Sequence, residues 1–152
     1  MLPLFYVVVY MVATIYHFSV QTYMSQVIKE ATVMVSTFGD LTTDHETYIN
    51  SKLANVLGKT KKDNENNWEI KYYLRDFDNE KGIPGELYQI NIGTSNIDKA
   101  DIIGIQVTSV DESLLGKVGS FNIFGGNDKV GGLYYTAYRE EIIRNEKRIE
   151  PK

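Results

Sequence analysis

The first third of the chain is apolar and uncharged, and its pattern predicts one long helix. Lys29 is the first charged residue, and neither Gly nor Pro interrupts the chain between Leu4 and Phe38. About 20 uncharged apolar residues suffice to cross a bilayer as a helix. At about 1.5 Å per residue, a helix of about 35 residues would be roughly 50 Å long. The first third is therefore predicted to be a rod whose first half can span a membrane.

The two halves of this predicted helix differ in how polar residues are distributed. Residues 4–20 are apolar on all sides, which is typical of a segment buried all round. From Gln21 onward, polar residues collect on one face. Apolar residues recur there at spacings of three and four, which indicates a helix that packs one face against a domain: Tyr23, Met24, Val27, Ile28, Ala31, Val33 or Met34, and Val35. Gly39 is predicted to end the helix, since glycine is favoured just past a helix C-terminus.

A second, shorter helix is expected immediately afterwards. Thr43 and Glu46 have the spacing of a capping box, with Thr43 as the N-cap. Apolar residues at helical spacing continue to Leu57, and Gly58 is the expected end. Residues 59–67 are polar and are predicted to form a loop.

Beyond residue 67 the apolar pattern changes to the short runs and alternation of β-strands. Strands are expected at 68–74, 87–92, 101–110 and 133–139, with a brief strand at 121–124. Residues 76–85 and 93–100 are predicted turns, and residues 140–152 a charged tail. Short polar connections favour an antiparallel sheet, and one face of such a sheet must be covered. The second half of the rod and the short helix are the available cover.

The predicted fold class is therefore α+β, with a long N-terminal apolar α-helix followed by a small head. The head would contain one short helix and an antiparallel β-sheet. Residues 1–39 are predicted to form the hydrophobic helix, and residues 40–152 the head domain.

Charge and cysteine content exclude several classes of function. The net charge is −4 and the isoelectric point is about 5.2, which argues against nucleic acid as a partner because phosphate contacts need a basic face. The absence of cysteine excludes disulfides and thiolate metal sites. Only Met1 precedes the apolar run, whereas signal segments usually begin with basic residues. We therefore expect a basic leader either to have been removed or to lie before the first residue of this sequence.

Candidate chemical motifs are weak. His17 and His45 fall in different predicted elements, so a shared metal site is disfavoured; His17 is expected at a helix–helix contact. Asp76, Asp78 and Glu80 alternate like calcium-loop ligands, but the required glycine at the sixth place is missing, which favours a solvated hairpin turn. The sequence thus predicts no catalytic residue, no metal ligand and no cofactor, and the protein is expected not to be an enzyme.

Two further features have a plain and a more specific interpretation. The eleven tyrosines could form an aromatic path for electrons, but contact area with a polar end is the favoured explanation. Six glycines lie between Gly116 and Gly132, without a phosphate-binding pattern. That segment is expected to be a surface loop.

The helix and the last strand resemble a known family. Leu2-Pro3-Leu4 opens the apolar run, Gln21 to Ala31 continues it, and Tyr138-Arg139-Glu140 ends the last predicted strand. In these features the chain resembles type IV pilin-like proteins, most closely the TadE-like pseudopilins of tight-adherence pili. Pilins carry a Glu at the fifth mature position, where this chain has Phe5; in TadE-like chains that Glu lies before the Leu-Pro pair. The mid-helix Pro or Gly of many pilins is also missing, and the head matches only in style.

The expected function is that of a structural subunit of an extracellular type IV pilus-like filament on the cell surface. Its partners would be other copies of itself, and, before polymerisation, the cytoplasmic membrane and the pilus assembly machinery. The alternative is a single-pass membrane-anchored minor pseudopilin or binding module that does not form the bulk of a fibre. The predicted filament core consists of apolar residues of the first helix: Leu4, Phe5, Tyr6, Val8, Met11, Val12, Ile15, Phe18, Tyr23 and Val27.

Overall fold

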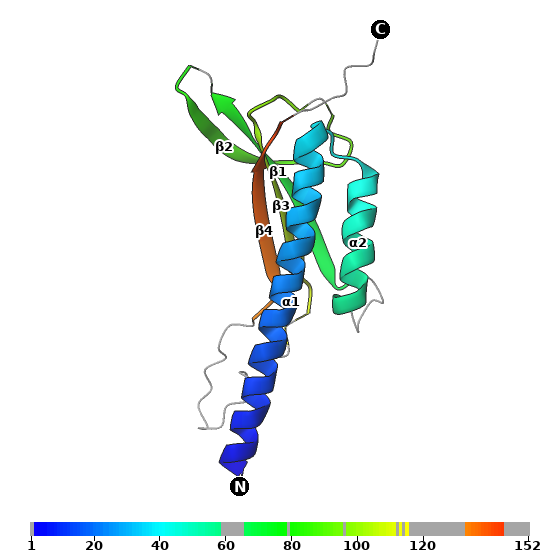
Figure 1. Ribbon diagram of the computed structural model, residues 1–152, viewed down its shortest axis with the longest axis vertical. Coiled ribbons are helices and arrows are strands. Elements are labelled where there is room, and N and C mark those ends of the chain that lie inside the picture. The colour runs from blue at the N-terminus through cyan, green and yellow to red at the C-terminus, as the bar shows by residue number, and fades with distance from the viewer. Residues whose placement is uncertain are drawn as a thin grey trace.

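A computed structural model describes residues 2–58, 66–78, 80–95, 97–111, 113, 115 and 133–144. In this part of the chain, helix α1 (Leu2–Phe38) is followed by α2 (Thr43–Leu57) and by the strands β1 (Trp68–Asp78), β2 (Ile83–Ile90), β3 (Ile102–Ser109) and β4 (Thr136–Ile142). The helices cover the sheet, and the N-terminal half of α1 projects beyond it (Figure 1). The predicted α+β fold, with a long apolar helix, a short helix and an antiparallel sheet, is confirmed.

The strands form one antiparallel sheet in the order β2-β1-β3-β4. β1 and β3 pair over eight residues, from Trp68 opposite Ser109 to Arg75 opposite Ile102. Side chains alternate between the two faces of a strand, and the buried ones of β3, including Ile103, Ile105 and Val107, face the helices. One face of the sheet is therefore the floor of the hydrophobic core.

The second half of α1 supplies a large part of that core. Its buried apolar residues recur at spacings of three and four and pack with residues of α2 and the sheet: Val20, Met24, Val27, Ile28, Ala31 and Val35. The predicted domain boundary between residues 39 and 40 therefore separates residues that share one core. The structural unit of the head includes α1 from about residue 20.

Hydrogen bonds from side chains hold α1 against its neighbours. The Tyr23 hydroxyl donates to the backbone oxygen of Lys52 in α2 at 3.2 Å. The Tyr48 hydroxyl donates to the Glu30 carboxylate, and this bond raises the pKa of Tyr48 to about 12. At the far end of α1, the Arg144 guanidinium donates to the Thr37 hydroxyl at 3.0 Å. The second half of α1 is thus tied to the head at several levels.

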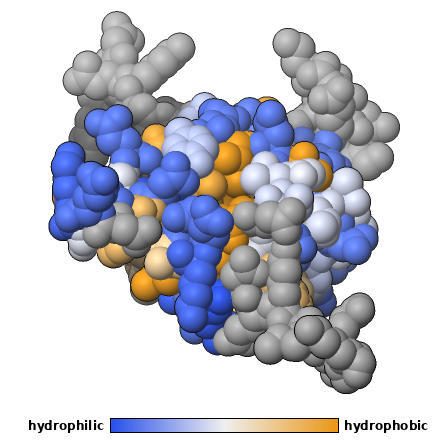
Figure 2. All heavy atoms as spheres, turned by 90° about the horizontal axis from the view of Figure 1, so that it is seen from above, coloured by the Kyte–Doolittle hydropathy of each residue, from blue (hydrophilic) through white to orange (hydrophobic). Residues whose placement is uncertain are grey.

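The end of the head away from the N-terminus has a mixed surface. Figure 2 looks down on this end, where hydrophilic residues surround a strip of hydrophobic atoms. α1 and β4 both end here, and Phe38 and Ile142 are among the exposed apolar residues. This small exposed group contrasts with the continuous apolar surface of the projecting half of α1.

The start of α2 differs by one residue from the prediction. Thr42, in an extended conformation, is the N-cap, and His45 occupies the third helical position. The His45 Nδ1 accepts a hydrogen bond from the Thr42 backbone N–H at 3.1 Å. The predicted cap of Thr43 with Glu46 is therefore wrong, because histidine here does what Glu or Gln does in the usual capping box.

The cap gives the head a testable pH dependence. Burial lowers the pKa of His45 below its usual 6.5, outweighing the backbone hydrogen bond and the nearby Asp44 and Asp40. The folded state therefore favours neutral His45, whose Nδ1 can accept from Thr42, and this stability is present above pH 6.5. It should be lost as the pH falls below 6.5 and through the lowered pKa.

Denaturant unfolding of wild type and His45→Gln at pH 7.5 and pH 5 measures this effect. Carboxylates also titrate in this range, so the informative quantity is the difference between the two proteins. We expect wild type to lose more stability than His45→Gln as the pH falls. Equal losses would show that the cap does not titrate.

The β1–β2 hairpin is longer than predicted. β1 continues to Asp78 and β2 begins at Ile83, so residues predicted as a turn at 76–85 are mostly strand. The Asp78 carboxylate accepts from the backbone N–H groups of Glu80 and Lys81 at 3.0 and 3.2 Å, and Gly82 has a positive φ of 67°. The Asp76 carboxylate accepts from the Tyr88 hydroxyl instead. Asp76 and Asp78 of the calcium-like pattern thus lie in β1 and stabilise the hairpin, Asp76 through Tyr88 of β2 and Asp78 within the turn.

The last strand lies three residues later than predicted. β4 begins at Thr136 and continues to Ile142, into the segment expected to be a charged tail. Charges are accommodated because Glu140 forms an ion pair with Arg75 at 3.1 Å across the outer face of the sheet. The predicted strand at 121–124, the loop at 59–65 and the tail at 145–152 lie outside the described residues.

Candidate functional site: the exposed half of α1

The exposed half of α1, residues 2–18, is the most unusual surface of the described chain. Most of its large apolar side chains are 46–84% exposed, including Phe5 at 70%, Met11 at 57% and Phe18 at 64%. Soluble monomers rarely expose a contiguous apolar surface of this kind, and such surfaces mark sites of contact with proteins or membranes. The exposed half of α1 is therefore the candidate functional site.

Only a narrow stripe of this half is covered. Ala13 is fully buried against Leu115, and Tyr6 and Val9 pack partly against the same pair. One turn further on, His17 is 8% exposed. These positions follow the same helical spacing as Val20 and Met24 in the core. The head thus covers one side of the helix, and the rest of its circumference stays apolar and open.

His17 does not lie at a helix–helix contact within the chain. Its ring stacks on Tyr135 with the ring centroids 5.1 Å apart and the planes at 25°. Its Nδ1 atom is buried and has no hydrogen-bond partner. His17 therefore joins α1 to the segment that leads into β4, and the prediction of a helix–helix contact is wrong for the single chain.

The structure separates the ten predicted filament-core residues into two groups. Seven are exposed on the projecting helix: Leu4, Phe5, Val8, Met11, Val12, Ile15 and Phe18. Tyr6 is half-buried beside Ala13, and Tyr23 packs partly against the head's core. Val27 is 4% exposed within that core, so it offers no surface to another copy. We therefore remove Val27 from the candidate site.

Four other large apolar residues on this half are exposed and were not in the predicted set: Leu2, Val7, Tyr10 and Tyr16. The signal for Val7, Tyr10 and Tyr16 was present, because residues 4–20 are apolar on all sides. When no side of a helix is polar, its sequence alone gives no physical reason to assign only some of its residues to a filament core.

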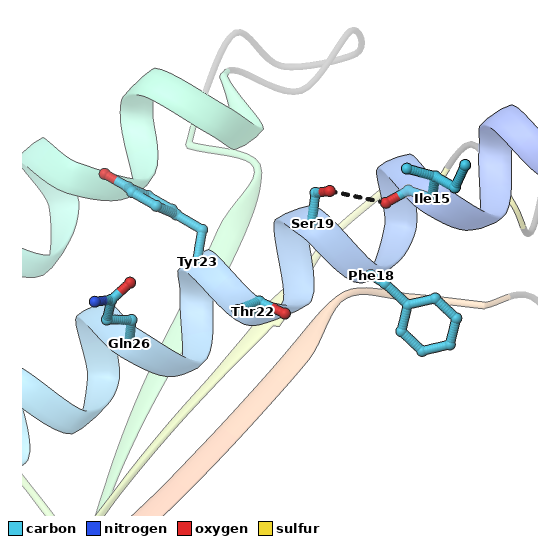
Figure 3. Close-up of a pocket in the computed structure, with 6 residues that line it drawn as sticks. All are labelled: Ile15, Phe18, Ser19, Thr22, Tyr23 and Gln26. Atoms are coloured by element: carbon cyan, nitrogen blue, oxygen red, sulfur yellow. Dashed lines mark hydrogen bonds between the residues drawn. The ribbon is translucent and has the colours of Figure 1, made fainter.

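The apolar surface ends in a shallow open groove along α1. Its lining comes from α1 alone and changes from apolar to polar along the helix: Ile15, Phe18, Ser19, Thr22, Tyr23 and Gln26 (Figure 3). The Ser19 hydroxyl donates to the backbone oxygen of Ile15 at 2.9 Å. Tyr23 points toward α2, whereas Phe18 points to the opposite side of the helix (Figure 3). A groove formed by one helix face cannot enclose a small ligand, but it can receive another helix or lipid.

The outer face of the sheet carries a polar cluster that is already satisfied. Tyr138 donates to Glu140 at 2.5 Å, and Arg75 donates to the same carboxylate oxygen at 3.1 Å. The bond from Tyr138 lowers the pKa of Glu140, and Arg75 adds to this. Gly104 makes room for the Tyr138 ring, because a Cβ atom there would lie 2.6 Å from the tyrosine oxygen. This arrangement stabilises the sheet and shows no group poised for catalysis.

The described residues include no group of three or more His, Asp and Glu side chains placed to hold a metal ion. Comparisons with protein-family models, curated proteins and solved structures found no match. What the chain does must therefore be argued from its own surface. By length and composition α1 can cross a membrane, and only 17% of its most apolar stretch is buried.

Proposed function

We propose that the protein is a structural subunit of an extracellular filament that polymerises through the exposed half of α1. Before assembly the same helix would lie in the cytoplasmic membrane. The observation that supports this proposal is the contrast between the two halves of one helix. One face of the second half is buried in the core, whereas the first half is apolar, uncharged and mostly exposed.

The energetics favour a partner for the exposed half. Burying apolar surface contributes about 25 cal/mol per Å², so 1,000 Å² per subunit corresponds to about 25 kcal/mol before the costs of association. Lipid or the apolar helices of other copies can supply this burial. Residues such as Phe5, Val8 and Met11 stay exposed after the head has folded, so folding alone does not satisfy them.

The distribution of the exposed residues favours a polymer over a dimer. Leu4, Val8 and Ile15 follow one course along the helix, while Tyr10 and Tyr16 lie on two other sides, and all are exposed. A helix with several apolar sides can contact several neighbours at once. Heterologous contacts that do not close into a ring generate open helical filaments.

The resemblance to type IV pilin-like, TadE-like proteins agrees with this arrangement of helix and head. Phe5 is 70% exposed near the start of α1. In the proposed filament, this side chain would contribute apolar burial against neighbouring subunits.

The test is the composition of material sheared from the surface of cells that express the chain. We expect thin filaments in negative-stain microscopy, and we expect this chain to be their main protein. The membrane fraction should hold a smaller pool. If the chain stays with the membranes and sheared material lacks it, the filament proposal is contradicted. The protein would then be a membrane-anchored minor pseudopilin or binding module.

A further inference from the structure

A second group of exposed apolar residues lies at the end of the head from which α1 projects. We call Val110, Leu133 and Tyr134, which are 53%, 44% and 44% exposed, the base group. Their two segments are adjacent, because the Ser109 N–H donates to the Tyr135 carbonyl at 2.8 Å and the Ser113 N–H donates to the Leu133 carbonyl at 2.8 Å. The base group is therefore one surface formed by the segments that follow β3 and precede β4.

Contacts along β4 show which part of α1 is level with the base group along the helix axis. The Thr136 N–H donates to the Gln21 side chain at 3.1 Å, and the Arg144 N–H donates to the Ser36 carbonyl at 2.8 Å. β4 thus runs in the same direction as α1. Leu133 lies three residues before Thr136, which is about 10 Å at about 3.3 Å per extended residue. The same distance along α1, at about 1.5 Å per residue, is roughly seven residues before Gln21. Leu133 is thereby level with about Thr14 along the helix axis, within the apolar segment.

A separate contact indicates the same position along the axis of α1. Leu115, two residues after Ser113, packs on Ala13. The base of the head therefore overlaps the apolar segment of α1 along the helix axis. If lipid surrounds the exposed half of α1 up to Phe18, it also reaches the base group.

We propose that the base group is a membrane contact that rests in the headgroup interface of the bilayer while the exposed half of α1 lies in the bilayer. This inference depends on the membrane stage of the proposed function. Tyrosine is enriched at membrane interfaces, where its ring is apolar and its hydroxyl stays hydrated. Asp111 adjoins Val110, and a carboxylate is costly in hydrocarbon. The contact is therefore limited to the interface, and the head is held at a fixed height and orientation on the membrane.

The chain has no cysteine, so single-cysteine variants of the full chain can carry one spin label each. Val110→Cys, Leu133→Cys and Tyr134→Cys would be labelled and reconstituted into phosphatidylcholine vesicles. Collisions of the label with oxygen, which concentrates in lipid, are compared with collisions with a water-soluble nickel chelate. Ile83→Cys and Leu87→Cys are matched controls, because both side chains are exposed and apolar but lie on β2. Val8→Cys reports whether α1 is in the bilayer.

We expect the ratio of oxygen to nickel collisions at the base group to be several-fold higher than at residues 83 and 87, and lower than at residue 8. If the residue 8 label is lipid-exposed while the base labels behave like the β2 labels, the inference is overturned and the membrane stage stands. If the residue 8 label is itself aqueous, the membrane stage is contradicted and the inference fails with it. Circular dichroism of each labelled variant confirms that the head is folded.

Discussion

Filaments are expected to disappear when Val8 is replaced by Asp, while the head remains folded. Val8 is 52% exposed on the projecting helix and is not part of the head's core. In a filament its side chain would be surrounded by apolar residues of other copies, where an unpaired carboxylate costs several kcal/mol. Each 1.4 kcal/mol weakens association about tenfold. One such cost at every subunit contact is enough to prevent a polymer from forming.

The measurement is the amount of filament in sheared surface material, with thermal unfolding of the purified variant as the test of folding. Ser25→Asp is the matched control, because Ser25 is exposed on the polar side of the same helix. Val8→Thr keeps the shape of the side chain without adding a charge, and it should weaken filaments while leaving membrane insertion intact. Normal filaments from Val8→Asp would contradict the role proposed for this half of α1.

The sequence predicted the elements that depend on local patterns. The apolar spacing from Met24 to Val35 correctly identified the face of α1 that packs on the sheet. Gly39 and Gly58 were correctly predicted to end the helices, and both have positive φ. Such features depend on residues a few positions apart, so a single sequence contains the information.

Features that depend on distant residues were not predictable in the same way. β4 extends past Arg139 because Glu140 meets Arg75 across the sheet, a contact between residues 65 positions apart. The cap of α2 moved to Thr42 because a histidine took the place of the usual acidic or amide side chain. These outcomes depend on tertiary contacts and on unusual use of a side chain, which pattern alone does not reveal.

The candidate site also combines features that local patterns predicted with features that depend on distant contacts. The apolar character of residues 4–20 predicted that this segment would need to be buried, and the structure leaves most of it exposed in the single chain. Val27 was assigned to the filament core because it continues the apolar series of the helix. The position at which the head begins to cover α1 is set by contacts such as Gln21 with Thr136 and Ala13 with Leu115. These contacts join residues about 100 positions apart. The sequence pattern, which placed the change at Gln21, therefore did not reveal the covered stripe at Ala13 and His17.

Removing all of α1 is expected to prevent the head from folding, whereas a chain that begins at Ser19 should fold. The six core residues that α1 contributes lie between Val20 and Val35. Full burial of a large apolar side chain contributes about 1.5–3 kcal/mol, so their loss costs on the order of 10 kcal/mol. That is comparable with the whole net stability of a typical domain, about 5–15 kcal/mol. Residues 40–152 alone would also expose Ile103, Ile105 and Val107 to water.

Thermal unfolding followed by circular dichroism, together with the dispersion of amide signals in NMR spectra, distinguishes the two chains. Residues 19–152 should unfold cooperatively and give dispersed signals, because this chain loses only the stripe around Ala13 and His17 at the base. Residues 40–152 should show neither property, and adding a peptide of residues 19–39 should restore both. The same peptide with Ile28→Asp should not restore them, since Ile28 is fully buried in the core. Cooperative unfolding of residues 40–152 alone would show that the head folds without α1. The packing instead predicts that the second half of α1 is part of the head. Only the first half is then free to meet a membrane or other copies.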